Sequence, residues 1–303
     1  HTLMQKPQRP PRLVRPNSLR AWWLAARPKT LSAALMPIVA ASAFAFTKDS
    51  FNWLPALLCI LFATLMQIAA NFINDLIDFR RGTDGAERLG PERACAQGWI
   101  KPIDMRIGIA LVLISACMVG LCLLPFGSLP LILIGLACVL FAFLYTMLLS
   151  YCGFGDVLVY VFFGFVPVCG TYFVEAGDLL PEIFLLGAGC GLVIDTLLVL
   201  NNYRDRTTDR VAGKNTLIVI FGERFGSLFY LGQGLIGCAC ISGAFAFNGR
   251  WSALLPLLYI PFHIATWREM VRINQGRALN KMLGKTSRNM ILLTLLMLLA
   301  AFL

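Results

Sequence analysis

Long apolar stretches recur along the whole chain and constrain its fold more than any other feature of the sequence. Crossing about 30 Å of hydrocarbon takes roughly 17–25 apolar residues in a helix. Such stretches cover residues 22–46, 53–78, 104–124, 128–148, 154–174, 181–205, 225–247, 251–271 and 287–303, and 58% of the 303 residues are hydrophobic. Because backbone polar groups in lipid must be bonded internally, we predict an all-α bundle of nine transmembrane helices in a lipid bilayer.

The basic residues lie between the apolar stretches and predict how the chain sits in the membrane. If the N-terminus is cytoplasmic and the stretches alternate in direction, all but two of the 26 Lys and Arg residues fall on the cytoplasmic side, the two being Lys48 and Arg250. This distribution follows the positive-inside rule. We therefore expect a multi-pass protein of the cytoplasmic membrane, with the N-terminus and the charged loops in the cytoplasm and the C-terminus outside. A basic tail, residues 1–20, would precede a single transmembrane domain, residues 21–303.

The formal net charge of +10 could also suggest a nucleic-acid partner. The basic residues are, however, distributed between apolar stretches and do not form a separate basic domain, so no nucleic acid is expected. Most of the 10 cysteines lie inside apolar stretches, without a CxxC pair or a Cys/His cluster. The cysteines therefore indicate neither a disulfide framework nor a zinc site.

Two of the predicted helices end in similar aspartate motifs on the same side of the membrane. Residues 71–78 read NFINDLID and residues 201–209 read NNYRDRTTD, and both place Asn four residues before Asp. The likeness indicates a weak internal repeat, with two aspartate-bearing helices around one site. Both motifs lie near helix C-termini, where the helix dipole disfavours negative charge.

The four aspartates of these motifs point to a bound cation. A single pair of aspartates is usually a solvated helix end, at a cost of about 0.2–0.5 kcal/mol for the like charges. Two pairs at the same depth favour Mg²⁺, which binds through one or two carboxylates together with substrate phosphates. We predict that Asp75, Asp78, Asp205 and Asp209 are catalytic metal ligands and that the substrate is a diphosphate.

Basic residues beside the aspartates are candidates for binding the diphosphate through charge-assisted hydrogen bonds. They are Arg80, Arg81, Arg88, Arg93, Arg204 and Lys214. Anchoring to anionic lipid is the alternative role, and for Arg80 and Arg81 the two roles are equally supported. Arg204 and Lys214, beside the second motif, are the stronger candidates.

Four further residues raise the question of what surrounds the reacting group. Asp195 lies inside an apolar stretch, where an ionisable group costs about 2.5–3.5 kcal/mol. It is either buried in neutral form against a neighbouring helix or part of an acceptor pocket. Departure of a diphosphate would leave an allylic cation, for which Tyr145, Tyr151 or Tyr160 could supply aromatic faces. Tyrosines in membrane helices more often serve in packing or anchoring.

At these motifs the sequence resembles the UbiA superfamily of intramembrane prenyltransferases, and within it the 1,4-dihydroxy-2-naphthoate polyprenyltransferase branch. The resemblance runs over nearly the whole chain. Its motifs are RPKT at 27–30, NDLIDFRRGTD at 74–84, RLGPERA at 88–94, GFGD at 153–156, NNYRD at 201–205, TD at 208–209, GKNTL at 213–217 and GRALN at 276–280.

The resemblance implies that the four aspartates hold Mg²⁺ and diphosphate, that Asn71 assists, and that Arg204 and Lys214 bind phosphate. It also implies a nine-helix bundle whose cavity opens sideways to lipid for the prenyl tail. Asp84 lies six residues after Asp78 and not four, so the motif does not carry a metal role over to it. The segment after Tyr145 lacks the glycine and prolines of the family pattern.

The implied reaction is transfer of a polyprenyl group from polyprenyl diphosphate to 1,4-dihydroxy-2-naphthoate, with loss of CO₂ and diphosphate, giving demethylmenaquinone for menaquinone biosynthesis. One alternative is a prenyltransferase for another aromatic acceptor, such as 4-hydroxybenzoate. Another is a secondary transporter, whose site would lie near the bilayer midplane. The carboxylates gather at one surface under long basic loops, which favours an enzyme.

Overall fold

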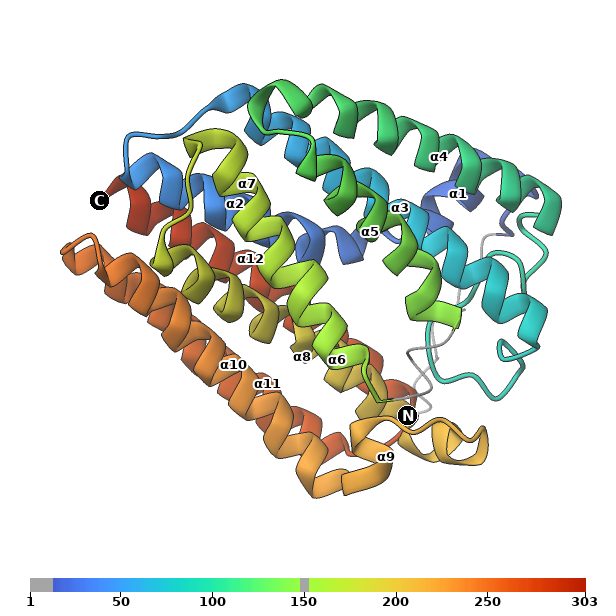
Figure 1. Cartoon of the computed structure of the whole chain (residues 1–303). Coiled ribbons are helices and arrows are strands. Elements are labelled where there is room, and N and C mark those ends of the chain that lie inside the picture. The colour runs from blue at the N-terminus through green and yellow to red at the C-terminus, as the bar shows by residue number, and fades with distance from the viewer. Residues whose placement is uncertain (1–12, 148–152) are drawn as a thin grey trace, which may run out of the picture.

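The computed structural model describes residues 13–147 and 153–303, which form a helical bundle without a strand in these ranges (Figure 1). The long helices are α2 (Leu31–Thr47), α3 (Trp53–Arg81), α4 (Pro102–Cys122), α5 (Pro130–Met147), α8 (Pro181–Val211), α10 (Glu223–Ala246), α11 (Tyr259–Ile273) and α12 (Asn280–Phe302). The shorter segments are α1 (Leu19–Ala26), η1 (Pro28–Thr30), η2 (Leu124–Phe126), α6 (Gly155–Val159), the π-helical η4 (Tyr160–Phe165), α7 (Val166–Ala176), α9 (Leu217–Phe221), η5 (Trp251–Leu258) and η6 (Arg277–Leu279).

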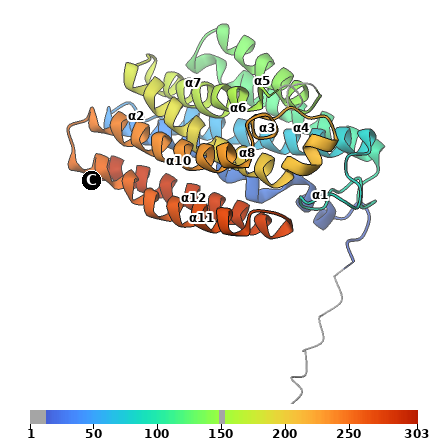
Figure 2. The ribbon, with the colours of Figure 1, turned by 90° about the horizontal axis from the view of Figure 1, so that it is seen from below.

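Eight helical segments of the described chain are long and apolar enough to cross a membrane. The protein is therefore a multi-pass membrane protein. The predicted stretch at 251–271 falls on η5 and α11 and is not among the eight, so the count of nine stays a prediction. Both segments nonetheless pack beside α12 (Figure 2).

The first predicted stretch, 22–46, is not one continuous helix. Arg27 has a left-handed backbone with φ of 53° and separates α1 from η1 and α2. The residue before a proline is disfavoured in the α region, and Pro28 follows Arg27 directly. The break directs α1 toward α3, where Trp22 packs on Phe72 at 5.4 Å between ring centroids.

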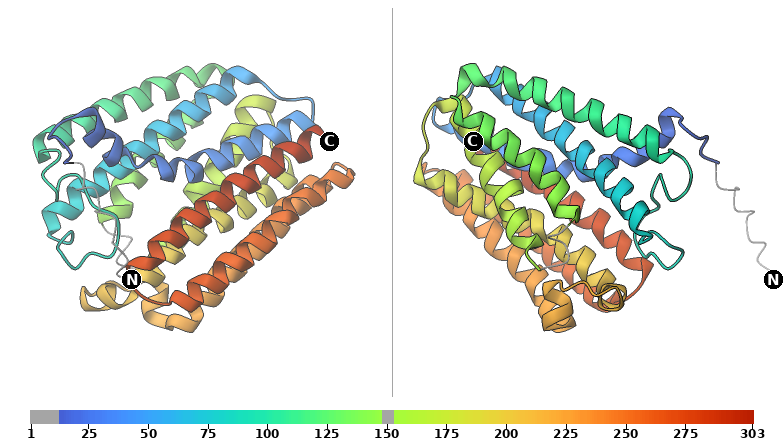
Figure 3. Two further views of the ribbon diagram at one scale, coloured as in Figure 1. Left: turned by 180° about the vertical axis from the view of Figure 1, so that it is seen from behind. Right: turned by 45° about the vertical axis from the view of Figure 1, so that its right-hand side comes forward.

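Helix α8 lies at the centre of the larger hydrophobic core and contacts α2, α7, α10 and α12. On the far face of the bundle α2 and α12 lie side by side (Figure 3, left). Glycines bring the backbone of α8 close to its neighbours: a Cβ on Gly189 would lie 2.7 Å from the carbonyl oxygen of Gly237 in α10. Small residues permit such close approach between membrane helices.

We expect Gly189→Leu to lower the melting temperature of the detergent-solubilised protein, because the new side chain must push α8 away from α10. Overpacking of this kind costs about 1–3 kcal/mol or more. Gly232→Leu on α10 is the control, since nothing lies within 4 Å of the Cβ that it would gain. Equal melting temperatures for the two variants would contradict the close packing.

Candidate functional site

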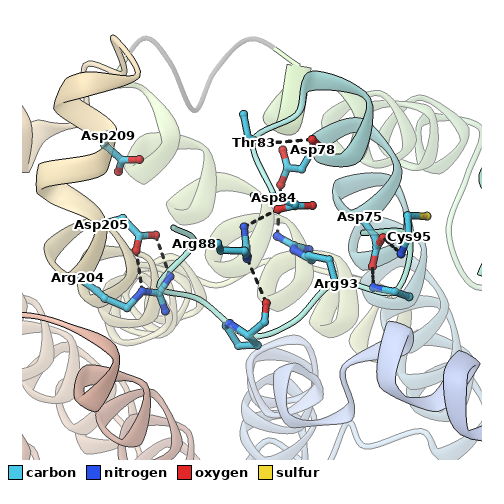
Figure 4. Close-up of polar contacts among 12 residues, drawn as sticks. Asp75, Asp78, Thr83, Asp84, Arg88, Arg93, Cys95, Arg204, Asp205 and Asp209 are labelled. Atoms are coloured by element: carbon cyan, nitrogen blue, oxygen red, sulfur yellow. Dashed lines mark hydrogen bonds and ion pairs between the residues drawn. The ribbon is translucent and has the colours of Figure 1, made fainter. Parts of the chain in front are cut away.

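The two aspartate motifs lie at the ends of α3 and α8, on the same side of the bundle (Figure 1). Helix α3 stops at Gly82, whose φ of 68° turns the chain away directly after the first motif. Gly213, with φ of 73°, does the same two residues after α8. Left-handed residues of this kind commonly end helices and are usually glycine. Residues 82–101, here called the basic loop, then cross between the two helix ends (Figure 4).

Asp75 fastens the basic loop to α3. One carboxylate oxygen accepts a hydrogen bond of 2.8 Å from the backbone N–H of Ala94, and the other accepts one of 2.9 Å from Cys95. The side chain is 2% exposed. In Figure 4 it points to the Cys95 side of the loop, away from the other motif. Both carboxylate oxygens of Asp75 accept hydrogen bonds from the loop in this structure. The role of Asp75 as a metal ligand therefore stays a prediction.

The other three predicted ligands face the space that the basic loop crosses, and each has a basic partner. Asp205 receives a two-pronged contact from Arg204, at 2.7 and 2.8 Å. Asp78 pairs with Arg93 at 3.4 Å, and Asp209 pairs with Lys214 at 3.7 Å. Figure 4 shows Asp205 and Asp209 on one side of the space and Asp78 on the other.

Asp84 joins this group although the spacing of its motif did not suggest it. Its carboxylate binds Arg88 at 2.7 Å and lies beside Asp78 in Figure 4. Burial raises the pKa of Asp84, and the charges of Arg88 and Arg93 oppose that rise. The pKa of Arg88 is lowered, mainly by burial and then by the charge of Arg93. The charges of Asp84, Asp78 and Asp205 oppose this lowering. Arg88 is thus electrostatically linked to both motifs.

Guanidinium groups converge in the middle of this space. A Cβ on Gly90 would lie 3.0 Å from Nη2 of Arg88 and 3.1 Å from Nη2 of Arg204, so the two cations meet over a residue without a side chain. Arg27 belongs to the same cluster, since Arg93, Arg88, Asp75 and Arg204 all act on its charge. Cations held this close together favour a shared anion between them.

Asn71, predicted to assist diphosphate binding, supports the corner that carries Arg27. Its amide donates hydrogen bonds of 2.9 Å to the carbonyl oxygen of Ala26 and to the hydroxyl of Thr30. Gln67 donates to Thr30 at 3.3 Å. In this structure Asn71 therefore fixes the left-handed turn at Arg27. Arg27 and Thr30 are the first and last residues of the RPKT motif. The motif marked this segment, but its residue types did not indicate what Arg27 and Thr30 do.

Two residues in η6 and at the start of α12 were missed as parts of the site. Asn280 accepts a hydrogen bond of 2.8 Å from Arg204 and donates one of 2.8 Å to the carbonyl oxygen of Leu89. Arg277 donates to the carbonyl oxygens of Ala86 and Arg88 at 3.3 and 3.2 Å. Both belong to the GRALN motif, whose residue types alone indicated no role. They hold the basic loop from the α12 side.

The predicted aromatic residues lie deeper in the bundle. Tyr145 packs against Phe141, with 5.5 Å between ring centroids, and Phe141 stacks on Phe162 at 4.3 Å. Tyr160 donates a hydrogen bond of 2.7 Å to Gln233. Tyr151 lies outside the described residues. Asp195 is fully buried in α8, and its carboxylate accepts a hydrogen bond of 2.7 Å from Gln233.

An apolar cavity of about 330 Å³ lies between α2, α3, α4, α5 and the η4–α7 segment. Its lining includes Phe62, Met66, Phe141 and Phe162. Gln67 also lines it and donates to Asn71 at 3.4 Å, so the cavity reaches the polar network beneath the basic loop. The apolar lining suits a hydrocarbon chain.

Within residues 13–147 and 153–303, no three His, Cys, Asp or Glu side chains lie close enough to hold a metal ion by themselves. The donor set nevertheless fits Mg²⁺, which is commonly held by one or two carboxylates plus substrate phosphates. Asp78 and Asp84 on one side, and Asp205 and Asp209 on the other, offer such pairs across the guanidinium cluster.

Comparison with known proteins agrees with this geometry. The model of the UbiA prenyltransferase family matches residues 34–302. The 1,4-dihydroxy-2-naphthoate octaprenyltransferase of Escherichia coli is 32% identical over 94% of this chain and 96% of its own length. The human UbiA prenyltransferase domain-containing protein 1 is 30% identical over 90% of this chain and 80% of its own.

A solved structure of a UbiA homolog from Archaeoglobus fulgidus, bound to GPP and Mg²⁺, has the same fold. The TM-score is 0.66 at 14% identity, over 93% of this chain and all of that one. The family match and the relatives together cover nearly the whole chain. The protein belongs to the UbiA prenyltransferase family.

Proposed function

We propose that this chain transfers a polyprenyl group from polyprenyl diphosphate to 1,4-dihydroxy-2-naphthoate, with loss of CO₂ and diphosphate, the step that gives demethylmenaquinone. The observation that carries the proposal is the interleaving of carboxylates and guanidinium groups at the polar end of an apolar cavity. The naphthoate acceptor is supported by relatives that carry its name.

Asp78, Asp205 and Asp209, together with Asp84, would hold Mg²⁺, and Asp75 would hold the basic loop over them. When bound, the ion neutralises charge that develops on the diphosphate as the bond between oxygen and the prenyl C1 breaks. Arg88, Arg93, Arg204 and Lys214 would exchange their carboxylate partners for phosphate oxygens. Arg204 is already oriented for this by Asn280.

The apolar cavity would hold the prenyl tail and exclude water from the allylic cation. Phe141 and Phe162, stacked in its wall, would present aromatic faces to that cation. The ring carbon that carries the carboxylate would then attack C1. Loss of CO₂ leaves the bonding electron pair on the ring, so the last step requires no strong base from the protein.

We further propose that the basic loop and the N-terminus face the cytoplasm and that the C-terminus lies outside. The positive-inside distribution of Lys and Arg supports this orientation. It places both aspartate motifs on one side, as a site for a single diphosphate requires.

The acceptor is tested by incubating the purified protein with Mg²⁺ and radiolabelled polyprenyl diphosphate. We expect a prenylated product from 1,4-dihydroxy-2-naphthoate and little from 4-hydroxybenzoate, because the motifs and relatives point to the naphthoate branch. Product from 4-hydroxybenzoate alone would keep the prenyltransferase class and overturn the naphthoate assignment.

A metal exchange series tests the ion. EDTA should abolish activity, and Mn²⁺ should restore it because it shares the preference of Mg²⁺ for octahedral oxygen ligands. Ca²⁺ should restore little, since its bonds of about 2.3–2.6 Å are longer than the 2.0–2.1 Å of Mg²⁺ and its geometry is looser. Full turnover in EDTA would contradict metal-held diphosphate.

A further inference from the structure

Asp156 and Asp195 form a buried pair of carboxyl groups that the steps above do not use. Asp156 lies in the first turn of α6 and is 4% exposed, and Asp195 lies in α8 and is fully buried. Each carboxyl group acts electrostatically on the other. Helix α6 packs directly on α8.

The hydrogen bonds around the pair leave one oxygen of each carboxyl without a donor. Gln233 donates from Nε2 to Oδ2 of Asp195 at 2.7 Å, and its own oxygen accepts from the hydroxyl of Tyr160 at 2.7 Å. Oδ1 of Asp195 and Oδ1 of Asp156 are both buried and have no hydrogen-bond partner. Ionised carboxylates can only accept. A proton on one of the two buried groups removes one of the two negative charges and supplies a donor.

The titratable groups around the pair are neutral, so they add no positive charge that would favour ionisation of both carboxyl groups. The titratable groups that act on it are Tyr145 from α5 and Tyr160 from η4, both neutral phenols at physiological pH. Two carboxyl groups that share one site cannot both ionise readily. The pair can thus hold a single proton and has capacity to take a second.

A small chamber lies between Asp156 and the part of α8 that precedes Asp205. It has about 20 Å³, and its lining includes Asp156, Tyr145, Asn202 and Thr216. That volume accommodates one water molecule or one hydroxyl group. Asn202 precedes Asp205 by three residues on α8, which is about one helical turn or 5 Å. A hydroxyl in the chamber would belong to a ring placed next to the diphosphate.

We propose that Asp156 and Asp195 share one proton and together take the proton of an acceptor hydroxyl placed in this chamber. Asp156 contacts the hydroxyl, and Asp195 acts through Asp156 as a positioning residue. The inference rests on the proposed function. The hydroxyl proton passes to Asp156, and the ring oxygen keeps the electron pair. The ring carbon bonds to the prenyl C1 as the bond from C1 to the diphosphate oxygen breaks. CO₂ then leaves, and the proton returns to the ring oxygen, so no net proton is consumed.

Infrared spectroscopy of the full-length protein in detergent tests the shared proton without any substrate. At neutral pH we expect a carboxylic-acid carbonyl band that shifts in D₂O and disappears in both Asp156→Asn and Asp195→Asn. A band that persists unchanged in both variants overturns the pair. If an Asn variant does not fold, Asp195→Glu must shift the band, and an unshifted band has the same consequence.

Kinetics test the role in catalysis. Asp156→Asn should lower kcat about 10²-fold, the usual contribution of a positioned base. Asp195→Asn should move the acid limb of the pH profile of kcat to higher pH, because the shared proton of Asp195 would no longer stabilise the anionic form of Asp156. Glu175→Gln, at the opposite end of the α6–α7 segment and bonded to Ser42, should leave the profile unchanged. An unchanged acid limb in Asp195→Asn contradicts the proposal.

The two tests also separate this inference from the proposed function. If the infrared band disappears in both Asn variants but the unmodified protein does not prenylate naphthoate, the shared proton is supported and the proposed function is contradicted.

Discussion

Replacing Asp78, Asp205 or Asp209 singly by alanine is expected to lower turnover by at least about 10²- to 10³-fold. Each carboxylate faces the space that would receive the metal-bound diphosphate, so each substitution removes one proposed ligand and leaves its basic partner without a counter-charge. Steady-state prenyl transfer measures the effect. Membrane insertion and melting in detergent should change little, because each aspartate lies at the end of its helix.

Two variants separate this role from general loss of charge. Glu92→Ala removes an exposed carboxylate from the same basic loop and should leave turnover unchanged. Asp75→Asn should also lower turnover, but with an unchanged Mg²⁺ requirement and faster proteolysis within the loop, since Asp75 binds the amides of Ala94 and Cys95. Full activity in two of the three alanine variants would contradict the metal site.

Arg204→Lys should lower kcat/KM for polyprenyl diphosphate by roughly 10²-fold, although the charge is kept. Two nitrogens of the Arg204 guanidinium donate hydrogen bonds to Asp205, and the third donates one to Asn280. An ammonium group has no planar fork and cannot make the three contacts together. The measurement is the dependence of initial rate on diphosphate concentration.

Arg210→Lys is the matched control, because Arg210 lies one turn or more further along α8 and is exposed. Its kinetic constants should equal those of the unmodified protein. Asn280→Ala should resemble a milder form of Arg204→Lys, since it frees one nitrogen of Arg204 and the carbonyl oxygen of Leu89. Equal losses in Arg204→Lys and Arg210→Lys would show that the effect is not specific to the site.

The bundle and the position of the site could be predicted from the sequence because both depend on local patterns. Apolar length located α3 and α8, and helical spacing put their aspartates near the same end. The break at Arg27 was missed: apolar length continues through it, whereas the left-handed turn depends on Pro28 and on hydrogen bonds from Asn71, 44 residues away along the chain from Arg27.

The pairing of individual side chains could not be predicted, because it depends on the path of the basic loop and on contacts between distant segments. Helical spacing alone does not distinguish Asp75, which binds loop amides, from Asp78, which faces the site. The partners of Asp195 come from α6 and α10, far from it in sequence. The links from Asn280 and Arg277 to the loop span about 190 residues.

The fate of the carboxyl group of the acceptor tests the central claim most directly. The purified protein would receive Mg²⁺, polyprenyl diphosphate and 1,4-dihydroxy-2-naphthoate labelled in its carboxyl carbon. We predict labelled CO₂ and diphosphate in equal amounts, each matching the prenylated product formed, which carries no label. A prenylated product that keeps the label on its ring, or the absence of any product from naphthoate, would contradict the account.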